Sequence, residues 1–246
     1  MSKKAYACDN CGTYISPMAG TIFEKSSTSL RLWFYSIYLM SATRCGISAK
    51  QIQRETGVTY KTAWRIFRQV RTLMSEDIRL EGPTVEMDET YVGGKRRGKA
   101  GRPTGGKGNK AIVVGIVERA AKGRVVAMVA DDVTRKTLHG MAEERILPAS
   151  TVYTDDFNAY HGLAAKGYNH RRINHSAGIY VMGDIHTQTI EGFWSLVKRG
   201  IGGVYHAVSH KYLQSYLNEY AFRYNRRNAN EPMFVSLLEQ VTAKAE

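Results

Sequence analysis

The sequence predicts a mixed α/β protein in which a small all-α domain precedes a larger α/β core. Residues 85–90 alternate apolar and polar side chains with the period of a strand, and β-prone runs follow at 111–117 and 124–130. Residues 28–76 instead repeat apolar side chains every three or four positions, as helices do. Leu80-Glu81-Gly82-Pro83 has the composition of a linker. We therefore expect four parts: an N-terminal arm at 1–27, a helical domain at 28–80, the α/β core at 81–228 and a C-terminal tail at 229–246.

Composition indicates the kind of partner. The 246 residues are 43% apolar, enough for a buried core, and carry a formal charge of +13. An excess of this size favours a polyanion, so we expect double-stranded DNA as the partner, with no small-molecule substrate. The longest apolar run, 30–42, is too short for a membrane span, and no membrane association is expected. Three cysteines, an odd number, argue against a disulfide framework, so we expect a cytoplasmic, nucleoid-associated protein.

The N-terminal arm contains one Cys-x-x-Cys knuckle, formed by Cys8 and Cys11. A structural zinc site needs four ligands, usually from two such knuckles, and no second knuckle follows. Either a first knuckle is missing from this start, or the loop is a vestige. Cys8 and Cys11 are therefore candidate zinc ligands that supply only half of a site.

A helix-turn-helix pattern follows within residues 28–80. Residues 47–56 are typical of a short helix, Gly57 of the turn, and Thr59 opens a second helix. The inward positions are apolar: Ile52, Val58, Ala63 and Ile66. The second helix is expected to expose cations that suit the major groove: Lys61, Arg65, Arg68 and Arg71. The alternative is an ordinary helical hairpin with a solvated basic face.

The α/β core begins with the strand at 85–90. The next segment, 93–110, interleaves cations with glycine, and we expect its Lys95, Arg96 and Arg97 to bind DNA phosphates. The elements that follow are expected in the order strand, strand, helix, strand, helix, strand, with helices after them: 111–117, 124–130, 134–147, 152–156, 157–165, 168–174, 190–198 and 208–224. This is the element order of an RNase H-like core, in which the first strand is central and neighbours the fourth.

Three carboxylates stand on elements that such a core brings together. Asp88 lies on the first strand, Asp155 ends the fourth, and Glu191 lies on the helix at 190–198. Seven helical residues turn through about 700°, so Lys198 lies within roughly 20° of Glu191 and about 10 Å further along the axis. The spacing therefore offers three acidic groups and one cation to a single site.

Converging carboxylates raise one another's pKa unless cations neutralise them, and hard oxygen ligands favour Mg²⁺ or Mn²⁺ over zinc. Two such ions would activate a water or a 3′-hydroxyl and stabilise the leaving oxygen, while Lys198 would hold a phosphate. The pattern thus predicts metal-dependent phosphoryl transfer with Asp88, Asp155 and Glu191 as ligands.

Other polar residues nearby have plainer explanations. Asp156 is expected to cap the following helix, and Glu86 to be a supporting or surface group; Glu89 is a third acidic neighbour. Three histidines are plausible neighbours of the site whose spacing does not demand a metal: His170, His175 and His186.

Several motifs together resemble the ISXO-like transposases of bacterial insertion sequences. They are Met87-Asp88-Glu89-Thr90-Tyr91-Val92-Gly93-Gly94-Lys95, Tyr153-Thr154-Asp155, His186 to Arg199, and Phe222-Arg223-Tyr224-Asn225-Arg226-Arg227, and the resemblance extends to Ala19-Gly20-Thr21-Ile22-Phe23 and the helix-turn-helix. It implies a DDE-type triad followed by a lysine, which falls on Asp88, Asp155, Glu191 and Lys198. It also implies transposition of a DNA element through its terminal inverted repeats. The family's zinc ribbon has two knuckles, and only Cys8/Cys11 matches it here.

We therefore expect a transposase that cuts the ends of its element and joins the 3′-hydroxyls to target DNA. Because two ends must be paired, a homodimer or larger synaptic complex is expected. Two alternatives remain: a non-catalytic DNA-binding regulator or decayed element copy, and a nuclease of the same fold that trims DNA without joining it.

Overall fold

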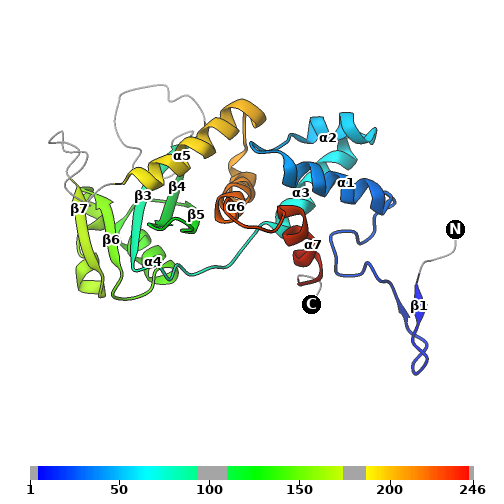
Figure 1. Ribbon diagram of the computed structural model, residues 1–246, viewed down its shortest axis with the longest axis horizontal. Helices are drawn as coiled ribbons and strands as arrows, with labels where there is room; N and C mark the ends of the chain where they lie inside the picture. Colours follow the sequence, from blue (N-terminus) through cyan, green and yellow to red (C-terminus); the bar gives the residue numbers. More distant parts are fainter. Residues whose placement is uncertain (1–4, 94–109, 174–186, 244–246) are drawn as a thin grey trace. The chain divides into compact units, whose positions relative to one another are not determined.

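The computed structural model describes residues 5–93, 110–173 and 187–243, and the chain divides into two compact units (Figure 1). One unit comprises Met1–Met74 together with Ala229–Glu246, and the other comprises Ser75–Asn228. The expected linker at 80–83 therefore belongs to the second unit, where Leu80 is fully buried and bridges to Ile146. None of the helices in the described ranges has both the length and the apolar character needed to cross a bilayer.

The N-terminal unit has the expected helices. Its described elements are β1 (Tyr6–Ala7), β2 (Tyr14–Ile15), α1 (Leu30–Ala42), α2 (Ala49–Thr56), α3 (Tyr60–Leu73) and α7 (Met233–Ala243). Between α2 and α3, Gly57 adopts φ +71°, a left-handed conformation that ends a helix and that glycine adopts without strain. The side chains of Ser48 and Thr59 accept backbone N–H groups at the starts of α2 and α3. These caps account for the predicted turn.

The C-terminal residues expected as a tail form α7, which contacts α1 and α3. Leu237 and Val241 on this helix are buried, and the ring of Phe234 meets the edge of Tyr38. The apolar spacing of residues 233–241 supplies one more helix face to the core of the N-terminal unit.

The second unit is built around one mixed sheet. Its described elements are β3 (Thr84–Val92), β4 (Ala111–Glu118), β5 (Val125–Ala130), α4 (Arg135–Arg145), β6 (Thr151–Asp155), η1 (Asn158–Tyr160), η2 (Leu163–Lys166), β7 (Asn169–Ile173), α5 (Gln188–Gly200), η4 (Ile201–Tyr205) and α6 (His210–Asn225). The strand order is β5-β4-β3-β6-β7, with β4 antiparallel to both neighbours and β3, β6 and β7 parallel. The first strand of this unit is thus central and neighbours the fourth, which confirms the RNase H-like core.

Apolar cores cover both faces of the central strands. Val85 and Met87 of β3 pack in a cluster with residues of α4 and η1, while α5 and α6 pack with alternate residues of β4 and β5 on the other face. The prediction of an α-helix at 157–165 is wrong. The chain forms two short 3₁₀ turns there, because Gly162 and Gly167 take left-handed conformations immediately before and after the second turn.

Candidate active site

β3 presents two carboxylates on the face of the sheet that α5 covers. Glu86 and Asp88 bond to residues of α5, whereas Val85 and Met87 lie in the cluster on the opposite face. The alternation predicted from the sequence is therefore confirmed. Because both faces of β3 are covered, Glu86 has no exposed surface and Asp88 is only partly exposed.

Asp88 is held by a tryptophan from α5. The indole Nε1 of Trp194 donates a hydrogen bond of 3.0 Å to Oδ2 of Asp88. Gly115, the cross-strand partner of Asp88 on β4, leaves room for this ring, because a Cβ there would lie 2.5 Å from the indole. A glycine inside the apolar run Val113-Val114-Gly115-Ile116-Val117 signals such a close approach. Gly115 is thus a local sign of this contact that the predicted site residues do not include.

The environment of Asp88 disfavours its charged form. Burial raises the pKa of this carboxyl from an ordinary 3.8 to about 7, and the charges of Glu89 and Asp155 act in the same direction. The hydrogen bond from Trp194 opposes this rise. Carboxylates forced together in this way are relieved either by a proton or by a cation.

Asp155 lies beside Asp88 on the neighbouring strand. Glu86 of β3 pairs with Tyr153 of the parallel strand β6, so Asp88 and Asp155, each two residues further on, share one face. Oδ1 of Asp155 accepts the backbone N–H of Phe157 at 3.1 Å, which orients the carboxylate where the strand ends. The structure thus brings together the first two of the three predicted acidic residues.

Glu191 stands exposed in the first turn of α5, three residues before Trp194. Its Oε1 accepts the hydroxyl of Thr187 at 3.0 Å. Lys198 is exposed on the same helix, seven residues further along. Within the described ranges, no three His, Cys, Asp or Glu side chains lie close enough together to hold a metal ion. Glu191 is therefore not gathered with Asp88 and Asp155 into one ligand cluster.

Glu86 fastens the start of α5 to the sheet. Its Oε2 accepts the backbone N–H of Ile190 at 2.9 Å, and its Oε1 accepts the hydroxyl of Thr189 at 2.8 Å. N–H groups in the first turn of a helix have no partner within the helix, and a negative charge there complements the helix dipole. Glu86 therefore positions the helix that carries Glu191 and Trp194.

Arg119 balances the buried charge of Glu86. Its Nε donates to Oε1 of Glu86 at 2.6 Å, and its guanidinium lies 4.0 Å from the ring centroid of Tyr153. The side chains of Arg119 and Glu86 are 13% and 0% exposed, so this ion pair is buried. Glu86, expected as a supporting or surface group, is a buried anchor.

Asp156 was expected to cap the following helix, and this prediction is wrong. Asp155 accepts the backbone N–H of Phe157 there instead. Asp156 accepts a hydrogen bond of 3.0 Å from Nη1 of Arg172 and lies 3.6 Å from His161. Glu89 faces away from Asp88 along β3 and accepts the hydroxyl of Tyr160 at 2.7 Å. Both residues therefore have partners outside the Asp88–Asp155 pair.

His170 lies on β7 with its Nε2 2.9 Å from the hydroxyl of Thr154, and burial followed by nearby cations lowers its pKa to about 4. It is paired with Val152, on the face opposite Asp155. A neutral imidazole on that face is not placed to bind a metal at the carboxylates. His175 and His186 lie outside the described residues.

The prediction that the cations of α3 are exposed is confirmed for three of the four residues. Lys61, Arg65 and Arg68 are exposed. Arg65 donates two hydrogen bonds to the carbonyls of Glu24 and Lys25, at 2.7 and 3.2 Å, and so also holds the segment before α1. The residues expected to bind phosphates after β3 are outside the described ranges: Lys95, Arg96 and Arg97.

The prediction that Arg71 is exposed is wrong. Its side chain is 1% exposed, and its guanidinium lies 3.8 Å from the ring centroid of Phe67, one turn earlier. The buried stripe of α3 includes Phe67 and Val70 and extends to Arg71. Position 71 therefore belongs to the core face of the helix, where its long side chain packs against an aromatic ring.

Cys8 and Cys11 lie at the turn between β1 and β2, and neither forms a disulfide. The backbone N–H of Gly12 donates to the carbonyl of Cys8 at 2.8 Å, which closes a knuckle of the expected kind. Hydrogen bonding with Thr13, followed by Cys8, lowers the pKa of the Cys11 thiol. The two thiols remain half of a zinc ligand set.

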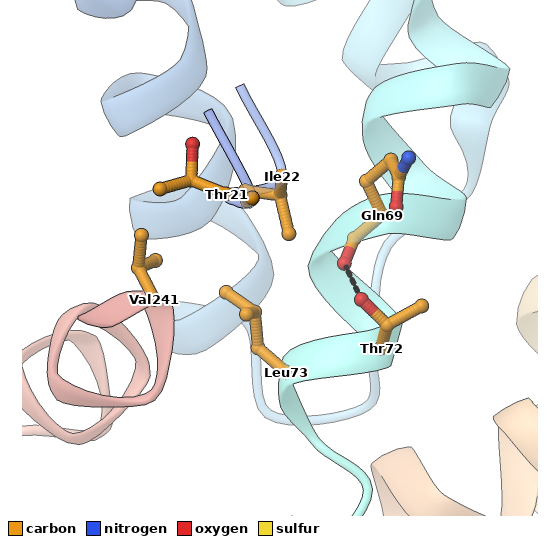
Figure 2. Close-up of a pocket in the computed structure, with 7 residues that line it drawn as sticks. Thr21, Ile22, Gln69, Thr72, Leu73 and Val241 are labelled. Atoms are coloured by element: carbon orange, nitrogen blue, oxygen red, sulfur yellow. Dashed lines mark hydrogen bonds between the residues drawn. The ribbon is translucent and has the colours of Figure 1, made fainter. Parts of the chain in front are cut away.

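A cavity of about 250 Å³ lies in the N-terminal unit (Figure 2). It is lined by Gly20, Thr21, Ile22, Gln69, Thr72, Leu73 and Val241. These residues come from the segment before α1, from α3 and from α7, and Oγ1 of Thr72 is bonded to the backbone carbonyl of Gln69. None of them is ionisable, so this cavity offers no group for acid–base or metal chemistry.

Comparisons with known proteins identify the family. The model of the ISXO2-like transposase domain matches residues 79–225. An uncharacterized protein in transposable element ISH50 of Halobacterium salinarum is 32% identical over 231 residues, covering 89% of this chain and 77% of that protein. An uncharacterized transposase-like protein of Haemophilus influenzae is 30% identical over 120 residues, 49% of this chain and 94% of that protein.

A chain from the crystal structure of a pre-cleavage Mos1 transpososome overlaps 91% of this chain and 82% of its own length, at 10% identity and a TM-score of 0.33. That score adds nothing to the family assignment. The domain match spans more than half of the chain, and the Halobacterium relative aligns with most of it. The resemblance seen in the sequence motifs is thereby confirmed: the chain belongs to the ISXO2-like transposases.

Proposed function

We propose that this transposase cuts DNA at the ends of its element and joins the freed 3′-hydroxyls to target DNA. The observation that carries the proposal is the pair formed by Asp88 and Asp155, which share one face of two adjacent strands. Their mutual repulsion contributes to the raised pKa of Asp88, and a divalent cation would relieve that repulsion. Oxygen-only donors of this kind fit Mg²⁺ or Mn²⁺.

Asp88 and Asp155 are the residues that would hold two such ions, and we propose Glu191 as their third ligand although the structure does not gather it into one cluster with them. When bound, these ions lower the pKa of an attacking water or hydroxyl and stabilise the leaving oxygen. The chain supplies the orientation. Trp194 holds one oxygen of Asp88, the backbone of Phe157 holds one oxygen of Asp155, and Glu86 seats the helix that carries Glu191.

Cations of both units would hold the DNA. Lys198, on the helix of Glu191, would bind a phosphate close to the scissile bond. Lys61, Arg65 and Arg68 on α3 are proposed to contact the element ends, with Lys95, Arg96 and Arg97 as further phosphate contacts. Because two ends are joined in one event, the active form is proposed to be a dimer or a larger complex.

Single substitutions test this proposal. Asp88→Asn, Asp155→Asn and Glu191→Gln should each abolish joining of labelled ends to a target plasmid in Mg²⁺, while binding to the ends persists. A matched control is Glu231→Gln, an exposed carboxylate of the other unit, which should join normally. Full joining by any one of the three variants would remove that residue from the site.

The products also separate the alternatives. Joined products identify a transposase, and cut but unjoined ends identify a nuclease. Binding without cutting by the wild-type protein would identify a DNA-binding regulator.

A further inference from the structure

A row of side chains crosses the sheet next to the carboxylate pair. Glu86 of β3 pairs with Tyr153 of β6, and Tyr153 pairs with Arg171 of the edge strand β7. Residues paired across strands project to the same face of a sheet. Tyr153 and Arg171 therefore lie on the face that carries Asp88 and Asp155.

This row lies close to the proposed reaction. Asp155 follows Tyr153 by two residues on the same strand, which is about 6.6 Å at ~3.3 Å per residue. One strand of a DNA duplex advances about 3.4 Å per nucleotide, so the row is within about two nucleotides of a phosphate held at Asp155.

Two side-chain hydrogen-bond donors of this row have no acceptor within the part of the chain that the structure describes. Arg171 is exposed, and among the residues that the structure describes its guanidinium forms no hydrogen bond or ion pair. Within the same residues, the hydroxyl of Tyr153 forms no hydrogen bond, although its ring is covered by Arg119. Arg119 is itself occupied by Glu86. A guanidinium and a phenol on cross-strand paired residues are thus left for an external acceptor.

The next residue along β7 behaves differently. Arg172 pairs with Thr154 and so lies on the opposite face of the sheet. Its Nη1 donates to Oδ1 of Asp156 at 3.0 Å and lies 2.5 Å from Nε2 of His161. Two adjacent arginines therefore differ in both face and occupancy, and only Arg171 is placed beside the carboxylates.

We propose that Arg171, assisted by the hydroxyl of Tyr153, binds a DNA backbone phosphate beside the cleavage site. This inference rests on the proposed function, because it takes the carboxylate face as the DNA-binding face. A guanidinium presents several N–H donors in a planar fork that matches the oxygens of a phosphate. Such a contact sets the position of the DNA and reads no base.

The salt dependence of DNA binding by the full-length protein tests the inference. Each phosphate contact contributes a slope of about 0.9 to log Kd against log salt. On a random-sequence duplex, Arg171→Ala should lower that slope by about one contact. Between about 50 and about 200 mM salt, wild-type protein should then lose about 3.5-fold more affinity than the variant. Arg171→Lys should restore the slope, because it keeps the charge.

Arg172→Ala is the matched control, since it removes the same charge from the neighbouring residue on the other face. Its slope should equal that of wild-type protein. An unchanged slope in Arg171→Ala, or an equal loss in Arg172→Ala, would overturn the assignment.

Joining assays on the same proteins separate this inference from the proposed function. If wild-type protein joins ends and Arg171→Ala binds DNA with the wild-type slope, only the inference fails. If wild-type protein joins no ends while Arg171→Ala still loses a contact, the proposed function fails and the phosphate contact remains.

Discussion

At the scale of single residues, Asp88 has a strongly altered pKa. Its pKa of about 7 exceeds the ordinary 3.8 because the carboxyl is buried beside Glu89 and Asp155. The folded protein therefore binds this proton more tightly than the unfolded chain. The resulting stabilisation is fully present below about pH 4 and is lost as the pH rises through about 7.

Asp88→Asn, which stays neutral, should avoid this loss. The difference in free energy of unfolding between the variant and wild-type protein should widen between about pH 4 and about pH 7, by a few kcal/mol, and then level off. Urea unfolding in metal-free buffers across this range measures it. A difference that does not vary with pH would contradict the raised pKa.

The hydrogen bond from Trp194 to Asp88 predicts a second effect. Trp194→Phe keeps an aromatic ring above Gly115 but removes the N–H donor. Because that donor stabilises the charged carboxylate, its loss should raise the pKa of Asp88 further and weaken Mn²⁺ binding at neutral pH, by about tenfold if the bond contributes ~1.5 kcal/mol.

Calorimetric titration of Mn²⁺ measures this change, and Phe193→Leu, beside the indole on the same helix, is a control that leaves the donor in place. Equal affinities in Trp194→Phe and wild-type protein would show that the indole N–H does not act on the metal site.

The position of Asp88 and Asp155 on adjacent strands was predictable, because the alternation along residues 85–90 and the order of the elements place both carboxylates there. Their supports were not. The indole that holds Asp88 is 106 residues away along the chain, and no local pattern records that contact. The face on which Glu86 lies followed from the alternation along β3. Its partner at the start of α5, the backbone N–H of Ile190, is apparent only in the three-dimensional structure.

At the scale of elements, the contact between Glu86 and α5 gives a direct test. Glu86→Gln removes the charge that faces both Arg119 and the first turn of the helix. Since breaking a buried ion pair from one side leaves an uncompensated charge, we expect a loss of about 3 kcal/mol in the free energy of unfolding.

Thr189→Ala is the matched control, because it removes one hydrogen bond to the same carboxylate and leaves its charge, at a cost of about 1 kcal/mol. Denaturant unfolding gives both values, and amide exchange should show the start of α5 opening more readily in Glu86→Gln. If the two variants are equally stable, Glu86 is not the anchor of the helix.

Most elements were predictable because each has a strong periodic pattern. β3, α2, α3 and α5 lie where the alternation, caps and apolar stripes place them. The segment after Asp155 was not, because its glycines at 162 and 167 interrupt a helical composition with left-handed turns. Arg71 was misplaced because a cation on a helix is usually exposed, and an aromatic neighbour overrode that tendency.

At the scale of the whole molecule, the charge of +13 predicted a polyanionic partner. The net charge alone did not say which unit carries the cations that would bind this partner. The structure describes exposed cations on α3 in the N-terminal unit, and Lys198 and Arg171 in the unit that carries the carboxylates. We therefore expect DNA binding and phosphoryl transfer to respond to different substitutions.

Lys61→Ala combined with Arg68→Ala tests this division. Both side chains are exposed on α3, whereas Arg65 also secures the carbonyls of Glu24 and Lys25 and is left intact. Loss of two phosphate contacts should lower the salt slope by about 1.8. The ratio of the double variant's Kd to the wild-type Kd should then fall by about 12-fold between about 50 and about 200 mM salt.

Lys50→Ala removes a cation that belongs to α2 and leaves the cations of α3 in place, and it should leave the slope within error of wild type. At saturating DNA and low salt, the double variant should still join ends in Mg²⁺, because Asp88, Asp155 and Glu191 belong to the other unit. Loss of joining under those conditions would mean that α3 contributes to the chemistry as well as to binding, and the division of labour between the two units would have to be abandoned.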